Sequence, residues 1–312
     1  MSNFLFLVTL ICIFYVQMLR YFSCEKLIFP TLKLKHVHIR DQKHLLRIIN
    51  VILKGGCSSL QIVTDFDLTL TKQHVNGKRV LSSFGIFSRC KQLPESYSVE
   101  SKRLYKKYRP IEIDPALPIE IKAEAMTDWV IASEGILKGI PFDPSEIPEV
   151  SKIYGGDLRD GTKELLEKLH CAEVPVLVFS AGLGDVVETV LKNHGVLFEN
   201  MKVISNFLKY KDGKLEGFQN KQLIHVFNKN EHAIEQDYFK VLEGRKNVLL
   251  MGDTIGDASM VDGMVDTCAV LKIGFLYDNV ENSLSSYMES FDIVLVDDQT
   301  MQVPIDILQR LL

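Results

Sequence analysis

Short apolar runs and amphipathic stretches alternate along most of this chain. Strand-length apolar runs lie at 59–64, 174–180, 203–204, 247–253, 269–275 and 292–296. Between them, apolar residues recur at helical spacing, as in 42–54, 162–170 and 185–195. Strands that alternate with helices favour a parallel sheet covered by helices on both faces, so the pattern predicts an α/β protein.

Residues 71–150 break this alternation. They are polar, contain seven prolines, carry helical patches at 96–108 and 119–138, and show no convincing buried strand. We therefore expect a mainly helical insertion over 71–154, placed after the first core strand. The α/β core then consists of residues 31–70 and 155–312. Within its second part, Asp212-Gly213 predicts the turn of a hairpin.

Composition narrows the range of functions. The chain has 312 residues, of which 46% are hydrophobic and 24% charged, as in a globular protein with a large core. The net charge of −4 argues against nucleic acid as a partner. Six scattered cysteines contain no CxxC pair, so neither a zinc site nor a disulfide framework is expected and a reducing compartment is the simpler interpretation.

Residues 1–30 form a separate apolar N-terminal segment. No charged side chain precedes Arg20, and a helix over residues 4–22 would be about 28 Å long, barely enough to cross a bilayer. A membrane anchor, a cleaved signal peptide and a dispensable extension all stay open. The excess of basic residues between Arg20 and Arg40 favours a cytoplasmic location for the domain that follows, whether or not it is anchored.

The first core strand ends in two acids, Asp65 and Asp67, followed by Thr69. Residues i and i+2 of an extended segment point to the same side, at the strand end where open α/β sheets bind their ligands. Two carboxylates at such a short distance repel each other unless a cation or proton lies between them. The pair therefore predicts a divalent metal. A strand followed by an Asx-capped turn is the simpler alternative.

Two further strand ends carry polar groups. Ser180-Ala181-Gly182 lies at a strand-to-helix junction, where free backbone N–H groups favour an anion. Asp253 ends another strand and Asp257 follows four residues later. Taken singly, each of these segments also fits an ordinary turn or helix cap. Lys229 matters only as the cation of this set, since most lysines are simply solvated.

These acids, the serine and the lysine follow one another in the order found in the haloacid dehalogenase-like phosphohydrolases, whose pattern is DxDxT, Ser/Thr, Lys and GDxxxD. The chain therefore resembles that superfamily. Within it, the chain is similar to the cytosolic 5′-nucleotidase III group, the pyrimidine 5′-nucleotidases, from about residue 31 onwards. The matching segments are DFDLTL, IEIDP (111–115), FSAGLGDVVETV (179–190), VISNF (203–207), LIHVFNK (223–229), MGDTIGD (251–257) and FDIVLVDD (291–298). The resemblance implies a three-layer Rossmann-like core with a helical cap.

The resemblance also assigns roles. Asp65 would be the nucleophile that forms an aspartyl-phosphate, and Asp67 the proton donor and acceptor. Mg²⁺ would be held by Asp65, the Asp67 carbonyl and Asp253, while Asp257 orients a metal-bound water. The residues that bind the phosphate would be Ser180, Ala181, Gly182 and Lys229.

Substrate choice would lie in the cap. Glu112 matches the family's base-reading glutamate, and Ser133 matches another substrate contact. Members of the group often have an aromatic residue beside the cap tryptophan, whereas Trp129 is followed here by Val130. Loss of that aromatic face would weaken the binding of a cationic methylated base. We therefore expect hydrolysis of CMP and UMP in preference to 7-methylguanosine monophosphate.

Three alternatives to that substrate and activity remain. Another small phosphomonoester, such as 7-methylguanosine monophosphate or phosphoserine, would keep the same chemistry. Transfer of the phosphoryl group to a second nucleoside would also keep it. The third alternative is a membrane-tethered nucleotide-binding protein without catalysis. The intact set of acids and lysine argues against it. The oligomeric state is left open by the sequence, which is compatible with a monomer.

Overall fold

The computed structural model describes residues 29–114, 116–229, 242, 244–264 and 267–312. Residues Thr31–Leu312 form one compact unit, distinct from Met1–Pro30, and the description below concerns that unit. Among the described residues, no helix has the length and apolar character needed to cross a membrane. The apolar segment 4–22, for which an anchor was one interpretation, lies outside the described residues.

A seven-stranded sheet forms the centre of the unit, in the order β1-β11-β10-β9-β2-β5-β6. All neighbouring pairs are parallel except β1 with β11. Six of the strands confirm the apolar runs in the sequence, whereas the three-residue edge strand β1 was not expected. The strands are β1 (Val37–Ile39), β2 (Leu60–Thr64), β5 (Val176–Leu183), β6 (Met201–Asn206), β9 (Asn247–Gly252), β10 (Ala269–Leu276) and β11 (Ile293–Val296).

Strand β2 is the point at which the sheet topology reverses. It pairs with β5 on one side and with β9 on the other, and all five of its residues are buried. Because these neighbours are parallel, the carboxyl ends of β2, β5 and β9 meet at one edge of the sheet. In an open α/β sheet a ligand binds at such a reversal point. Asp65 and Asp253 directly follow β2 and β9, and Ser180 lies within β5, three residues before its end.

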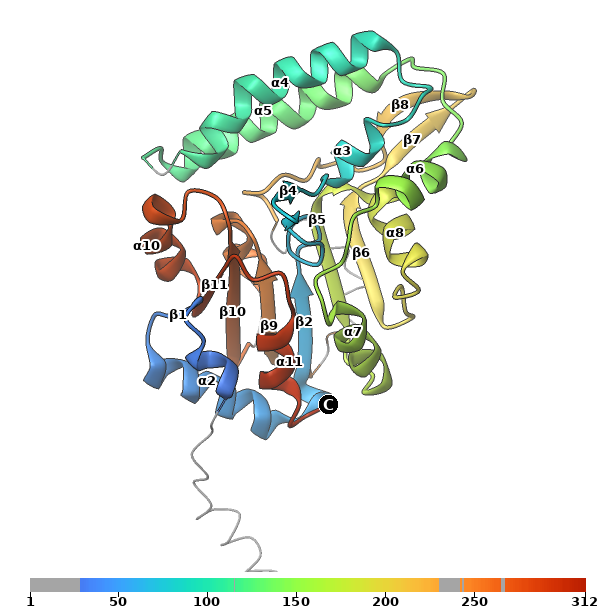
Figure 1. The fold of residues 1–312 in the computed structure, drawn as a ribbon. Helices are drawn as coiled ribbons and strands as arrows, with labels where there is room; N and C mark the ends of the chain where they lie inside the picture. The colour runs from blue at the N-terminus through green and yellow to red at the C-terminus, as the bar shows by residue number, and fades with distance from the viewer. Residues whose placement is uncertain (1–28, 115, 230–241, 243, 265–266) are drawn as a thin grey trace, which may run out of the picture. The chain divides into compact units, whose positions relative to one another are not determined.

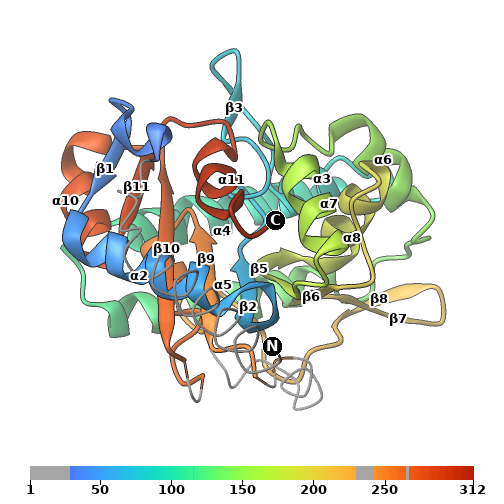
Figure 2. The ribbon, with the colours of Figure 1, turned by 90° about the horizontal axis from the view of Figure 1, so that it is seen from below.

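Helices cover the sheet, and Figure 2 shows α7, α8 and α11 together on one face. The first, α2, begins after Asp41, whose side chain accepts hydrogen bonds from two N–H groups of the first turn, and ends where Gly56 has a φ of 71°. The helix predicted from the spacing of apolar residues over 42–54 is therefore confirmed. The helices are α2 (Gln42–Gly55), α7 (Thr162–Cys171), α8 (Gly184–Asn193), α10 (Val280–Ser290) and α11 (Gln302–Leu308).

The segment between β2 and α7 lies over the carboxyl edge of the sheet (Figure 1). Its two long helices, α4 and α5, pack against each other along their length. The helical character predicted for this insertion is confirmed, while its domain boundaries remain a prediction. Its elements are β3 (His74–Val75), β4 (Lys78–Arg79), α3 (Ser83–Phe87), α4 (Glu95–Ile113), α5 (Ile119–Leu137) and α6 (Glu146–Tyr154).

A hairpin from the core extends this cap. Strands β7 (Leu208–Lys211) and β8 (Lys214–Phe218) are joined by Asp212-Gly213, with φ values of 50° and 72°. Two consecutive positive φ angles are typical of a tight hairpin turn, so the predicted turn is confirmed. Glu134 of α5 accepts a hydrogen bond from the Phe218 N–H at 3.2 Å. The hairpin and α5 therefore form a continuous wall above the sheet.

Candidate active site

Three carboxylates and one lysine gather at the carboxyl ends of β2 and β9; we call this group the acid cluster. Asp65, Asp253 and Asp257 each place an oxygen within 4.8 Å of the others. The Lys229 Nζ lies 2.7 Å from Asp65 Oδ1 and 2.5 Å from Asp257 Oδ1. The Lys229 side chain is only 1% exposed, so its charge is shared with these carboxylates and not with water.

Local structure holds each member of the acid cluster in place. Asp257 Oδ2 accepts hydrogen bonds from the backbone N–H groups of Asp253 and Thr254 and from the Thr254 hydroxyl. Gly252 is required beside it, because a Cβ there would lie 2.2 Å from the Asp257 Cβ. The segment leading to Lys229 is fixed by Asn206, whose side chain bonds both the N–H and the carbonyl of Ile224.

The charges of the acid cluster do not balance. Burial raises the pKa of Asp65 to about 7, with Lys229 opposing the rise and Asp257 adding to it. Burial also raises the pKa of Asp253 well above its usual value, and Asp65 adds to that rise. For Lys229, burial disfavours the charge, but Asp257 and Asp65 together raise its pKa. Two buried carboxylates and one half-buried carboxylate facing one ammonium fit an added divalent cation with oxygen ligands, as Mg²⁺ prefers.

Asp67 points away from the acid cluster towards the base of the cap. Its two carboxylate oxygens accept hydrogen bonds from Ser83, one from the backbone N–H at 2.8 Å and one from the hydroxyl at 2.6 Å. The Ser83 hydroxyl in turn accepts one from the Leu183 N–H at 3.0 Å. Burial raises the pKa of Asp67, while the two bonds from Ser83 oppose that rise. The Asp67 side chain is therefore fixed beside the acid cluster without belonging to it.

The sequence predicts that strand β5 ends at Ser180, but in the structure it continues to Leu183. Its pairing with β6 shifts register between Phe179 and Leu183, an irregularity of the kind often found next to active sites. The Gly182 N–H donates to the Ser180 hydroxyl at 3.1 Å. A Cβ on Gly182 would lie 2.1 Å from the Ser83 hydroxyl and 2.7 Å from Asp67, so glycine is needed for this close approach.

Arg159 is a buried cation behind the loop that carries Asp67. It is 1% exposed and donates to the carbonyls of Leu68, Thr69 and Asp298. Burial lowers the pKa of Arg159 to about 10, with Asp253 and Asp298 opposing the change, so the guanidinium stays charged at neutral pH. Leu68 has a positive φ of 64°, and its carbonyl is held by this guanidinium. Arg159 therefore ties the loop after β2 to the loop after β11.

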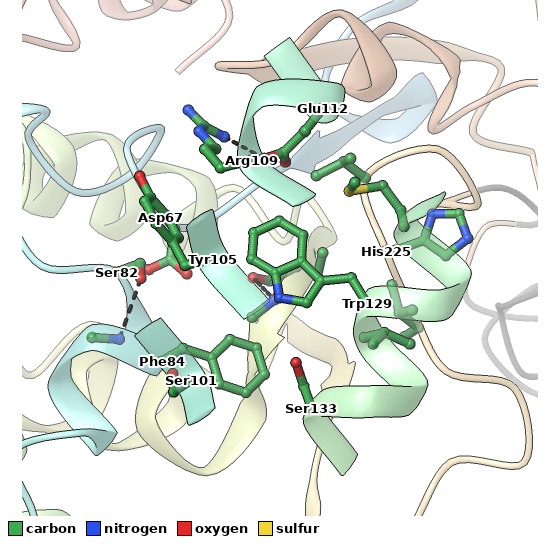
Figure 3. Close-up of a pocket in the computed structure, with 18 of the residues that line it drawn as sticks. Asp67, Ser82, Phe84, Ser101, Tyr105, Arg109, Glu112, Trp129, Ser133 and His225 are labelled. Carbon is green, nitrogen blue, oxygen red and sulfur yellow. Dashed lines mark hydrogen bonds and ion pairs between the residues drawn. The ribbon is translucent and has the colours of Figure 1, made fainter. Parts of the chain in front are cut away.

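A cavity of about 500 Å³ extends from the acid cluster to the cap. Its far side is formed by side chains of α4 and α5 (Figure 3). Trp129 stacks on Tyr108 with ring centroids 5.9 Å apart and meets Tyr105 edge-on at 6.1 Å. We call the residues on this side the cap wall, which consists of Tyr105, Arg109, Glu112, Trp129 and Ser133.

Glu112 is the one acid of the cap wall. Its side chain is 11% exposed, and its Oε2 lies 2.6 Å from the Arg109 Nη1 one helical turn earlier. Burial lowers the pKa of Arg109, but the ion pair with Glu112 outweighs this and raises it overall. Pro110 lies between them inside α4 and has no N–H to donate to the preceding turn.

The structure brings together all the site residues predicted from sequence. The ten that line this single cavity are Asp65, Asp67, Glu112, Ser133, Ser180, Ala181, Gly182, Lys229, Asp253 and Asp257. Their individual roles remain predictions. Sequence reasoning missed Ser83, Arg109 and Arg159, since their partners lie in other parts of the chain or one helical turn away and no motif includes them.

Comparison with known proteins agrees with this geometry. Residues 68–312 match the family model described as pyrimidine 5′-nucleotidase (UMPH-1). This chain belongs to that family. It is 48% identical over 278 residues to the 7-methylguanosine phosphate-specific 5′-nucleotidase of Drosophila melanogaster, covering 88% of this chain and 87% of the relative. The family assignment makes the protein a 5′-nucleotidase, a phosphoric monoester hydrolase.

Solved structures show the same relationship. The crystal structure of cytosolic 5′-nucleotidase IIIB bound to cytidine superimposes with a TM-score of 0.86 at 46% identity, covering 91% of this chain and 96% of that one. A probable phosphoserine phosphatase from Vibrio cholerae shares only 14% identity, with a TM-score of 0.50 over 82% of this chain and 66% of that one, and supports the fold alone. The haloacid dehalogenase-like α/β fold expected from the sequence is thereby confirmed.

Proposed function

We propose that this 5′-nucleotidase acts on nucleoside 5′-monophosphates whose base carries an amino group, CMP and 7-methylguanosine monophosphate. The observation that carries the proposal is the position of Glu112. It lies in the same cavity as Asp65, on the cap wall, with aromatic rings beside it. A phosphate at the acid cluster and a base at Glu112 would occupy the two ends of that cavity.

The chemistry follows from the acid cluster. Asp65 attacks phosphorus in line and forms an aspartyl-phosphate, while Asp67 gives a proton to the departing 5′-oxygen and later takes one from the attacking water. Lys229 neutralises phosphoryl oxygens, and the polar groups of Ser180, Ala181 and Gly182 bind them. Mg²⁺, held by Asp65, the Asp67 carbonyl and Asp253 with Asp257 orienting its water, would supply the remaining positive charge.

Donor groups on the base decide how well it suits Glu112. A carboxylate accepts hydrogen bonds and offers none, so it favours the amino group of cytosine. Uracil presents one N–H between two carbonyl oxygens, and these oxygens would face the carboxylate unfavourably. We therefore expect CMP to be a better substrate than UMP.

A second substrate is favoured by the aromatic part of the cap wall. Trp129 and Tyr105 offer ring surface to a cationic base even though Val130 is not aromatic. The amino and N1–H donors of 7-methylguanine also lie side by side, as a carboxylate prefers. The Drosophila relative is named for this substrate, and the similar crystal structure contains cytidine. The proposal therefore replaces the preference for CMP and UMP that Val130 suggested with one for CMP and 7-methylguanosine monophosphate, and a substrate panel decides between the two.

A substrate panel tests the proposal directly. Phosphate release is measured for CMP, UMP, 7-methylguanosine monophosphate, AMP and phosphoserine, with Mg²⁺ and with the metal chelated. We expect the highest kcat/KM for CMP and 7-methylguanosine monophosphate, and loss of activity on chelation. Faster turnover of phosphoserine than of either nucleotide would refute the base-recognition role of Glu112. Added nucleoside in the same assay would reveal phosphoryl transfer as a new monophosphate.

The place of action is a separate part of the proposal. The similar crystal structure is of a protein named cytosolic, and the positive flank of the N-terminal segment favours the same side of a membrane. We infer that catalysis takes place in the cytoplasm. Fractionation of tagged full-length protein, compared with a variant lacking residues 1–30, would show whether the segment attaches the enzyme to membranes.

A further inference from the structure

Arg109 forms an ion pair with Glu112, the side chain that is expected to bind the base. Its Nη1 lies 2.6 Å from Glu112 Oε2, and both groups line the substrate cavity. Figure 3 shows the pair on α4, with Trp129 drawn between it and Ser133. No other hydrogen-bond donor reaches Glu112 among the residues that the structure describes. Oε1 is therefore the oxygen that is left for a base.

The ion pair also changes the charge that a base meets. An isolated carboxylate would attract a cationic base, whereas a carboxylate paired with a guanidinium presents almost no net charge. The pair is partly withdrawn from water, since the Arg109 side chain is 28% exposed and that of Glu112 is 11% exposed. Its mutual attraction is therefore screened less than that of a surface pair.

We propose that Arg109 is a specificity-determining residue that lowers the preference of the enzyme for a cationic purine base relative to cytosine. Arg109 acts by covering one oxygen of Glu112 and by neutralising its charge. This inference rests on the proposed function, because it assumes that Glu112 receives the base. It adds the residue that sets the ratio between the two proposed substrates.

The two bases should respond differently because their donors differ. The amino group of cytosine needs one acceptor, which Oε1 provides. In 7-methylguanine the N1–H and amino donors lie side by side and match both oxygens of a free carboxylate. The cation of 7-methylguanine also gains from an unneutralised Glu112. Both effects of Arg109 therefore penalise 7-methylguanosine monophosphate more than CMP.

A different role for Arg109 would give a different result. The nearby Asp253 contributes to the raised pKa of Arg109, so the guanidinium also lies within electrostatic reach of the acid cluster. If Arg109 served mainly to hold the substrate phosphate, its loss would lower kcat/KM for all nucleotides by the same factor. The ratio between two nucleotides separates this role from the proposed one.

The experiment compares kcat/KM for 7-methylguanosine monophosphate and CMP in the wild type, Arg109→Met and Arg109→Lys. Arg103→Met is a matched control, since Arg103 forms a similar i,i+3 pair with Glu100 on the same helix but outside the cavity. We expect Arg109→Met to raise the ratio of the two kcat/KM values by about tenfold in favour of 7-methylguanosine monophosphate. Arg109→Lys should raise it less, and Arg103→Met should leave it unchanged.

A coupled variant tests the route through Glu112. In a Glu112→Gln background the carboxylate charge is absent, so adding Arg109→Met should alter the ratio by less than about twofold. Thermal unfolding of each variant confirms that it is folded, and Arg109→Lys keeps the test available if Arg109→Met does not fold.

The outcomes separate this inference from the proposed function. If the wild type hydrolyses both nucleotides and Arg109→Met leaves the ratio unchanged or lowers it, the inference is wrong and the proposed function stands. If the wild type hydrolyses neither nucleotide, both are wrong.

Discussion

The acid cluster and the cap wall lie at opposite ends of one cavity and are built in different ways. In the acid cluster, Asp65, Asp257 and Lys229 are almost fully buried and are held by backbone groups or by one another, while Asp253 is half-buried. In the cap wall, Tyr105 is 53% exposed and Glu112 is held by a single ion pair on its own helix. Charges that are fixed and dry suit bond breaking, whereas loosely held side chains allow the choice of base to vary.

Removing Asp65, the proposed nucleophile, should have the largest effect. Asp65→Asn keeps the shape of the side chain but abolishes attack on phosphorus, so kcat should fall by about 10³-fold or more. The control Asp262→Asn changes an exposed acid on the segment after β9 and should retain activity. Steady-state phosphate release from CMP measures both. Near-normal turnover by Asp65→Asn would mean that another group attacks phosphorus.

The loop that carries Asp67, beside the acid cluster, is held by a buried cation. Arg159→Met leaves the carbonyls of Leu68, Thr69 and Asp298 without their donor, which should cost about 3 kcal/mol of unfolding free energy. Arg103→Met, at an exposed ion pair, should cost less than about 0.5 kcal/mol. Urea denaturation compares the two variants. Equal midpoints would show that the buried guanidinium contributes no stability through these bonds.

The acid cluster was largely predictable from the sequence, because an apolar run followed by an acid identifies a strand end. Parallel strands then bring Asp65, Ser180 and Asp253 to one edge. The supporting residues were not predictable in this way. Arg159 binds carbonyls 90, 91 and 139 residues away in the chain, and carbonyls carry no sequence signal.

The cap wall was predictable only in part. Helical spacing identified α4 and α5, and the family resemblance indicated Glu112 and Ser133. The ion pair of Arg109 with Glu112 depends on side-chain directions near Pro110, which spacing alone does not fix. Likewise, the two bonds from Ser83 to Asp67 depend on how the cap returns to the edge of the sheet.

A smaller effect is expected where the cap wall offers ring surface. Trp129→Ala removes a ring that lines the cavity, and loss of base stacking should raise the KM for CMP by about tenfold. Ribose 5-phosphate has no base, so its KM should change less. Trp129→Phe, which keeps an aromatic face, should recover part of the loss. An equal rise in KM for both substrates would indicate that Trp129 supports the cap without contacting the base.

The smallest predicted effect concerns His225, which joins the segment before Lys229 to α5. Its Nδ1 accepts from the Phe227 N–H at 3.2 Å, so Nε2 carries the proton towards the Thr127 hydroxyl at 3.1 Å. Burial lowers the pKa of His225 to about 4. The unfolded chain, with a histidine pKa of about 6.5, therefore binds more protons between these values, and the stabilisation present above pH 6.5 is lost as pH falls towards 4.

Replacing His225 with glutamine isolates this titration, because glutamine offers a similar donor but does not ionise in this range. Between pH 7 and pH 4.5 the wild type should lose about 1 kcal/mol more unfolding free energy than His225→Gln, allowing for solvent screening in the cavity. Urea denaturation at each pH measures the difference. The exposed His194→Gln is the control and should follow the wild type. If His225→Gln loses as much unfolding free energy as the wild type between pH 7 and pH 4.5, the contact between the cap and the core does not depend on a neutral imidazole.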